Sequence, residues 1–183
     1  MGPCKVVKEV RELVRQGKQR EIPNYLVEKE YIGNNKRAMQ IIDFARFLGF
    51  KVFQKNIDLP ERIYGMIAVD KNYIKKFGTD KIIILNEQDS YYHKRCVVAH
   101  ELGLYLLHYE GNGTLYEVYR ESNTHDEGRE QEVNKFADTL LMPTREFQNV
   151  SNLYNGNIDV LSTLFEVPEE AVRRKFTRLM ESC

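Results

Sequence analysis

The sequence of 183 residues has no tryptophan, only three cysteines and no excess of either charge. An odd number of cysteines without CxxC spacing argues against a disulfide framework and predicts a reduced, cytoplasmic protein. Basic and acidic residues number 27 each, so the overall charge gives no support to tight nucleic-acid binding.

Long hydrophobic runs are missing as well. No stretch approaches the roughly 20 apolar residues that a bilayer-spanning helix needs. The charged N-terminal segment lacks the apolar core of a signal peptide. The composition, with 42% hydrophobic and 30% charged residues, is typical of a globular domain. We therefore expect a soluble protein with one main domain and no membrane contact.

Two hydrophobic periods alternate along the chain. Helical spacing predicts helices over 5–16, from Asn34 or Asn35 to Gly49, and over 93–109, 129–142, 157–165 and 168–181. Short runs rich in branched residues predict strands around 52–53, 66–69 and 82–85. Residues 20–33 are ambiguous, and 110–128 look like a polar connection. These elements predict an α+β fold with a small, three-stranded, mostly antiparallel sheet packed on helices.

The most informative segment, residues 96–108, has the sequence CVVAHELGLYLLH. Its helix is apolar on nearly every side, which predicts burial. His100 and Glu101 lie within this apolar surround, where an unpartnered carboxylate is costly, so a metal-bound water is one candidate for its compensation. Gly103 is unusual in a helix, where glycine costs about 1 kcal/mol relative to alanine. Close approach of another backbone would explain it.

His-Glu-x-x-His places two imidazoles one turn apart on one helix face, where both reach one zinc ion and the glutamate acts as general base. Here the second histidine position holds Leu104, which cannot bind a metal. His108 cannot replace it on a straight helix, because it lies about 12 Å from His100 along the axis. We expect His108 to be a partly exposed histidine at the helix end.

A second segment, residues 130–143, has the sequence EQEVNKFADTLLMP. Its helix presents a core face, and Glu130 lies beside that face, where a further metal ligand would come from. A lone helical glutamate is usually solvated, but the His-Glu helix makes a pocket-facing Glu130 an equal alternative. Asn134, one turn later, could orient a histidine as a metal-site support. Glu132 points elsewhere and is a weaker candidate.

These two segments resemble a known family. Residues 100–108 are similar to the HELGHxLLH signature of the ImmA/IrrE zinc metallo-endopeptidases, and 130–143 are similar to that family's ExEANxFAxxLLMP segment, with Val133 in place of alanine. The resemblance covers about residues 34–180. It implies an N-terminal helical extension (1–33), a minimal zincin-like domain (34–150) and a C-terminal helix pair on the same domain (151–183).

The resemblance also implies a function. Members are intracellular, are often encoded on mobile elements or in stress responses, and known ones cleave helix-turn-helix repressors. Carried over by position, His100 and Glu130 would be zinc ligands and Glu101 the general base. The remaining ligand position is Leu104, where the pattern fails, so we expect zinc to bind weakly or not at all.

Three explanations of Leu104 stay open. The chain is a non-catalytic relative that kept the fold and its partner-binding groove, or it recruits another ligand, with His125 the best candidate, or the leucine was introduced into an active protein. The leading hypothesis is a family member that acts on a transcriptional repressor, with peptidase activity impaired or lost. The alternative is a non-catalytic antirepressor that binds without cutting.

A weaker alternative is DNA binding by residues 157–180, which resemble a helix-turn-helix. The four cations Arg173, Arg174, Lys175 and Arg178 predict a basic face on the last helix. A charged terminal helix is more often solvated, so we expect nucleic-acid binding to be absent.

Overall fold

The computed structural model describes residues 2–18, 21–28, 40–57, 61–120 and 127–180. Its strands are β1 (Lys51–Lys55), β2 (Ile63–Val69), β3 (Lys81–Asn86) and β4 (Leu115–Arg120). Its α-helices are α1 (Pro3–Arg15), α2 (Ile22–Glu28), α3 (Ile41–Phe47), α4 (Ile74–Phe77), α5 (Tyr91–Gly103), α6 (Glu127–Leu141), α7 (Thr144–Leu153), α8 (Ile158–Phe165) and α9 (Glu169–Met180). A short 3₁₀-helix η2 (Lys71–Tyr73) precedes α4, and a π-helix η3 (Leu104–His108) continues α5.

The four strands form one sheet in the order β1-β3-β2-β4. The predicted α+β class and the three predicted strands are confirmed. The strand β3 runs parallel to β1 and antiparallel to β2, and β4 adds an antiparallel edge beside β2. The expectation of three strands is therefore wrong by one. The polar connection predicted over 110–128 contains β4, an edge strand whose exposed and half-buried residues conceal its alternating pattern.

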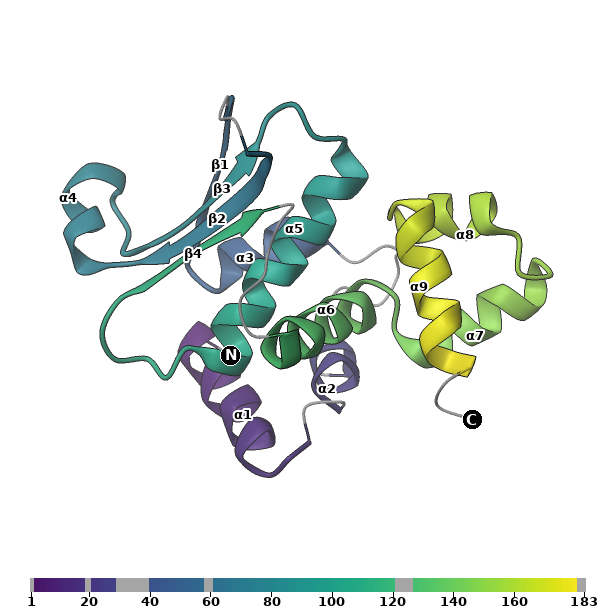
Figure 1. Cartoon of the computed structure of the whole chain (residues 1–183). Helices are drawn as coiled ribbons and strands as arrows, with labels where there is room; N and C mark the ends of the chain where they lie inside the picture. The colour runs from purple at the N-terminus through teal and green to yellow at the C-terminus, as the bar shows by residue number, and fades with distance from the viewer. Residues whose placement is uncertain (1, 19–20, 29–39, 58–60, 121–126, 181–183) are drawn as a thin grey trace.

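One face of the sheet is covered by α5 and α3, as Figure 1 shows. At Gly65 in β2 the approach of α5 is so close that an added Cβ would lie 2.5 Å from Val97 Cγ1. Ile67 and Ile83 of the sheet and Val97 and Val98 of α5 are fully buried in the same cluster. This packing fixes α5 on the sheet and so fixes where the His-Glu segment lies.

The helix α6 crosses α5 at the second glycine contact. A Cβ on Gly103 would lie 3.1 Å from Val133 Cγ1 and 3.2 Å from Phe136 Cδ1, both on α6. The close approach expected at Gly103 is confirmed, although the nearest atoms belong to side chains. The two helices that bear the candidate site are therefore held at a separation that leaves no room for a methyl group.

The N-terminal helix α1 packs against η3. Val6 and Val10 are fully buried, and the Arg11 guanidinium lies over the rings of Tyr105 and Tyr109 at 5.8 and 5.7 Å. The predicted helix over 5–16 is confirmed within the bounds of α1. The structure also places α2 within the ambiguous stretch 20–33, and α2 lies against α6.

The C-terminal helices gather at the end of the molecule away from α4 (Figure 1). The two predicted tail helices are confirmed as α8 and α9, whereas α7 was not predicted. Glu166 links α8 to α9 in the left-handed region, at φ 52°. Buried Arg95 of α5 holds this turn, donating to the Glu166 carbonyl at 2.9 Å and lying 3.3 Å from its carboxylate.

The division of the chain into segments 1–33, 34–150 and 151–183 stays a prediction. One cluster of buried apolar residues includes members of α1, α5, α6 and α9, and the predicted boundary after residue 150 lies inside α7. Within the described part of the chain, no helix is long and apolar enough to cross a membrane.

Candidate metal-site remnant on α5 and α6

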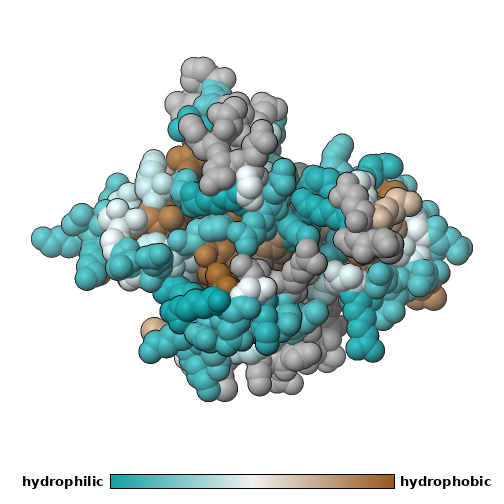
Figure 2. Space-filling view, turned by 60° about the horizontal axis from the view of Figure 1, so that its bottom comes forward, coloured by the Kyte–Doolittle hydropathy of each residue, from teal (hydrophilic) through white to brown (hydrophobic). Residues whose placement is uncertain are grey.

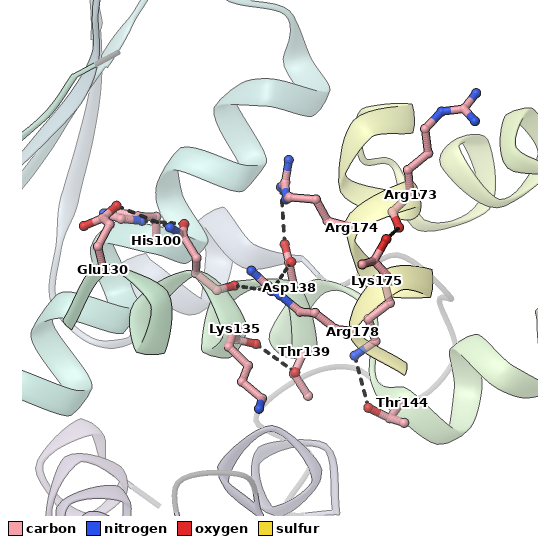
Figure 3. Close-up of polar contacts among 12 residues, drawn as sticks. His100, Glu130, Lys135, Asp138, Thr139, Thr144, Arg173, Arg174, Lys175 and Arg178 are labelled. Carbon is pink, nitrogen blue, oxygen red and sulfur yellow. Dashed lines mark hydrogen bonds and ion pairs between the residues drawn. The ribbon is translucent and has the colours of Figure 1, made fainter. Parts of the chain in front are cut away.

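His100 and Glu130 come from different helices and face one another (Figure 3). The ring Nδ1 of His100 lies 3.2 Å from Asn134 Oδ1, and the Asn134 amide nitrogen donates to Glu130 Oε1 at 3.4 Å. Because an amide oxygen can only accept, His100 donates its Nδ1–H, and its Nε2 keeps the lone pair. Asn134 thus fixes the orientation of both neighbours, the arrangement by which outer residues position metal ligands.

The atoms that face each other are both acceptors. His100 Nε2 lies 3.6 Å from Glu130 Oε1, while burial lowers the pKa of His100 against the opposing effect of the Glu130 charge. A neutral imidazole therefore presents a lone pair to a carboxylate, which is unfavourable unless a cation lies between them.

Glu101 is the second unusual group. It is 0% exposed, and neither carboxylate oxygen has a hydrogen-bond partner among the described residues. Burial raises the pKa of Glu101 well above its ordinary value, and the charges of Glu117 and Glu130 add to the rise. The charged form of the side chain is therefore disfavoured, and its polar atoms are left unsatisfied among the described residues.

The edge strand β4 adds residues that the sequence analysis did not assign to this site. The ring of Tyr119 stacks on His100 with centroids 4.1 Å apart and planes at 20°. Burial raises the pKa of the Tyr119 hydroxyl to about 12, so it stays a hydrogen-bond donor at neutral pH. On the same strand Glu117 pairs with Arg129 of α6 at 3.0 Å. Glu117 and Tyr119 lie two residues apart and so share one face of the strand, but the mixed exposure of β4 hides this spacing in the sequence.

Leu104 occupies the remaining position. Its backbone is helical, and its N–H reaches the carbonyls of His100 and Glu101, so residues 100 and 104 lie one turn apart despite the π-helix that begins here. The side chain is only 6% exposed. It offers no donor atom, and the described residues contain no group of three histidine, cysteine or acidic side chains able to hold a metal. The described residues do not complete a three-ligand zinc site.

The sequence itself agrees with this geometry. Residues 59–177, about two thirds of the chain, match the peptidase M78 family, described as the IrrE N-terminal-like domain. The chain belongs to the IrrE N-terminal-like family. The predicted resemblance is thereby confirmed, and the family is typically zinc-dependent. No curated protein matches the chain.

A solved structure supports the fold of this IrrE-like chain. The structure of a Mycobacterium tuberculosis transcriptional regulator is similar over 91% of the chain, with a TM-score of 0.56 and 16% sequence identity. The chain covers 50% of that protein, so it spans about half of its length. At this identity the likeness concerns the fold alone.

The other described histidines of the IrrE-like chain, His93 and His108, pair with carboxylates outside the candidate site. His108 is half-buried and its Nε2 lies 3.5 Å from the Glu132 carboxylate of α6, so both residues point to each other rather than to the candidate site. His93 pairs with Asp89 at 3.2 Å near the start of α5. His125, the predicted substitute ligand, lies outside the described residues.

The predicted basic face of α9 is partly turned toward α6 and α7, while Arg173 points away from α6 (Figure 3). Arg178 and Arg174 both pair with Asp138 of α6, Arg174 at 3.5 Å, and Arg178 also donates to the Asn134 carbonyl at 3.3 Å. Lys175 is 4% exposed and donates to a threonine hydroxyl of α7. Arg173 and Arg174 remain exposed, so the predicted basic face is confirmed only in part: Lys175 is buried, and Arg178 is half-buried against Asp138 of α6.

Proposed function

We propose that this IrrE-type chain acts on a regulatory protein, of the helix-turn-helix repressor kind, and that its zinc-dependent peptidase activity is impaired or lost. The observation that carries the proposal is Leu104, a buried apolar side chain one turn from His100 on the same helix face. Hydrolysis by this family needs a metal-activated water, and two protein ligands hold zinc far more weakly than three.

The surroundings support a former metal site rather than a chance cluster. His100 and Glu130 are positioned by one asparagine, and Glu101 is buried with both oxygens unpartnered. In a complete site of this family, the glutamate would take a proton from a metal-bound water. Without a third ligand this chain keeps the positioning residues and the fold around them, which supports retention of partner binding.

The test restores the missing donor. Protein purified without chelator is analysed for zinc by mass spectrometry, as the natural chain and as Leu104→His. We expect little zinc in the natural chain and stoichiometric zinc in Leu104→His, because residue 104 already has the backbone of a ligand position. Zinc uptake should be accompanied by a higher unfolding temperature.

A matched control distinguishes zinc binding at this site from incidental zinc binding by any added histidine. Leu107→His places the same side chain on the same segment, at a half-buried position that does not follow His100 by one turn. It should take up no more zinc than the natural chain. Stoichiometric zinc in the natural chain would refute the loss of the site and would favour a substitute ligand such as His125.

The partner is tested with the natural chain as a non-cleaving trap. Immobilised protein is incubated with extract of its source cells, and captured proteins are identified by mass spectrometry. The proposal expects the natural chain to capture a DNA-binding regulator that remains intact. If Leu104→His restores the site, the variant should cleave the same regulator into shorter fragments. Capture of DNA in the absence of any protein would support the weaker alternative instead.

A further inference from the structure

The connection between β2 and β3 is larger than joining these strands requires. Antiparallel neighbours can be linked by two residues, yet residues 70–80 form η2 and α4. No side chain of either helix is buried. Figure 1 shows this segment projecting from the sheet, at the end away from α7 to α9. An ordered extension that adds nothing to the core is typical of a recognition element.

This projection, named here the basic knob (residues 70–80), is held in one conformation. At its base the Asp70 N–H donates to the Asp80 carbonyl at 2.8 Å, and the Asp70 carboxylate caps η2 by accepting from the Asn72 N–H at 2.8 Å. Lys51 of β1 donates to the Phe77 carbonyl at 2.5 Å, at the end of α4. A surface that is rigid before binding loses less conformational entropy when a partner docks.

The two sides of the basic knob differ. On one side Phe77 packs against Tyr73 and against Phe53 of β1, with ring centroids 5.6 and 5.4 Å apart. On the other side, Lys71, Ile74 and Lys75 follow the i, i+3, i+4 spacing of a shared helix face. Ile74 is 53% exposed, one of the few large hydrophobic side chains so exposed in the described chain. An isoleucine therefore lies between two lysines and faces the solvent.

The knob carries three lysines and, at its base, the two aspartates Asp70 and Asp80. Lys71, Lys75 and Lys76 are all exposed, and among the described residues no carboxylate forms an ion pair with them. In Figure 2, where left and right are as in Figure 1, the surface at this end is mostly hydrophilic. Lys71 and Lys75 beside Ile74, with Lys76 over the Phe77 ring, give a positive potential that attracts an acidic partner, and Ile74 offers an apolar contact that retains it.

We propose that the basic knob is a docking site for an acidic protein segment that contains an apolar residue. The lysines favour a partner that is acidic. Exposed Ile74 favours a partner that also offers an apolar side chain, which a phosphate backbone cannot provide. Phe77 packs against Tyr73 and Phe53, and Lys76 lies over its ring, which disfavours the stacking of single-stranded nucleic-acid bases there. The basic knob lies apart from His100, so this proposal does not depend on whether zinc binds there.

The experiment measures binding of the whole chain to a short fluorescein-labelled peptide of glutamates and leucines by fluorescence anisotropy. We expect binding at low ionic strength that weakens with added salt. The double variant Lys71→Glu/Lys75→Glu should bind at least about tenfold more weakly, and Ile74→Ser about threefold to tenfold more weakly. The unfolding temperature of both variants should match that of the natural chain, because the substituted side chains are exposed.

Lys8→Glu/Lys18→Glu is the matched control, since it reverses two exposed lysines in or beside α1, outside the knob. It should bind the peptide as the natural chain does. A peptide in which serine replaces leucine should bind as weakly to the natural chain as the original peptide binds to Ile74→Ser. Absence of peptide binding, equal losses in knob and control variants, or tighter binding to duplex DNA or to phosphatidylserine vesicles would overturn the proposal.

Discussion

Glu101 and Asp138 are two buried carboxylates on crossing helices, and they differ in what surrounds them. Asp138, 5% exposed, has Arg174 and Arg178 beside it, whereas Glu101, 0% exposed, has no hydrogen-bond partner among the described residues. Burial raises the pKa of each above its ordinary value, but only at Asp138 do positive charges oppose the rise.

The Asp138 carboxylate contributes contacts that stabilise the fold, whereas burial of the Glu101 carboxyl costs stability. Asp138 connects α6 to α9, so its burial is compensated by contacts that join two parts of the chain. Among the described residues the Glu101 carboxyl has no hydrogen-bond partner, and proteins retain the cost of such a buried unsatisfied group mainly at functional sites. Its isolation is understandable if the site around it was shaped for a metal-bound water.

The largest expected effect on the free energy of unfolding comes from restoring a zinc site beside Glu101. In Leu104→His, zinc should raise the free energy of unfolding by about 4 kcal/mol when free zinc exceeds its dissociation constant about a thousandfold. Urea denaturation with and without zinc measures the gain, and the natural chain under the same conditions is the control. Equal gains in both proteins would show that zinc binds elsewhere.

Removing the partners of Asp138 should have the next largest effect. The double variant Arg174→Ala/Arg178→Ala leaves a buried carboxylate uncompensated and should lower the free energy of unfolding by about 3 kcal/mol. Arg173→Ala removes an exposed arginine of the same helix, paired only with Glu169, and should change stability by less than about 0.5 kcal/mol. Similar values for the two proteins would mean that Asp138 does not depend on its arginines.

Replacing Glu101 should act in the opposite direction. Glu101→Met keeps the side-chain size but removes the unsatisfied carboxyl, so it should raise the free energy of unfolding by about 2 kcal/mol. Glu146→Met, at an exposed position of α7, controls for a general effect of methionine and should be nearly neutral. A clear loss of stability in Glu101→Met would reveal a partner for Glu101 beyond the described residues.

The smallest effect concerns Lys175 and is visible only as pH changes. Burial lowers the pKa of Lys175 from 10.5 to about 8 in the folded chain. The folded state then binds fewer protons than the unfolded state between these values, so stability from this group rises with pH across that window, by at most about 1.4 kcal/mol per pH unit. Subtracting the pH profile of Lys175→Met isolates the slope, and a flat difference would contradict the lowered pKa.

The sequence predicted the family and the approach of α5 and α6 because both helices carry strong, regular signals. The HELG segment is apolar around a His-Glu pair, and Glu130 and Asn134 share a face one turn apart. The structure brings His100, Asn134 and Glu130 together, although their role as metal-site residues stays a prediction. Gly103 alone predicted the close approach of another segment, because glycine is unfavourable inside a buried helix unless a neighbour needs the space.

The strand β4 and the contributions of Tyr119 and Glu117 were not predicted. An edge strand pairs on one side only, so its pattern mixes exposed tyrosine, charge and half-buried positions instead of alternating cleanly. The pairing of Arg174 and Arg178 with Asp138 was equally hidden, because Asp138 is distant in sequence and is brought close only by tertiary packing. Long-range polar pairing of this kind leaves no periodic trace in a single sequence.

The helical backbone at Leu104 has a consequence for the history of the chain. Because the main chain there is helical and Leu104 follows His100 by one turn, a histidine at this position would need no rebuilding of the scaffold. Some leucine codons differ from histidine codons by a single base. Under the proposed function, a lineage with this leucine would stand one point mutation from the complete HExxH pattern, so gain and loss of catalysis could alternate in evolution while the fold persists.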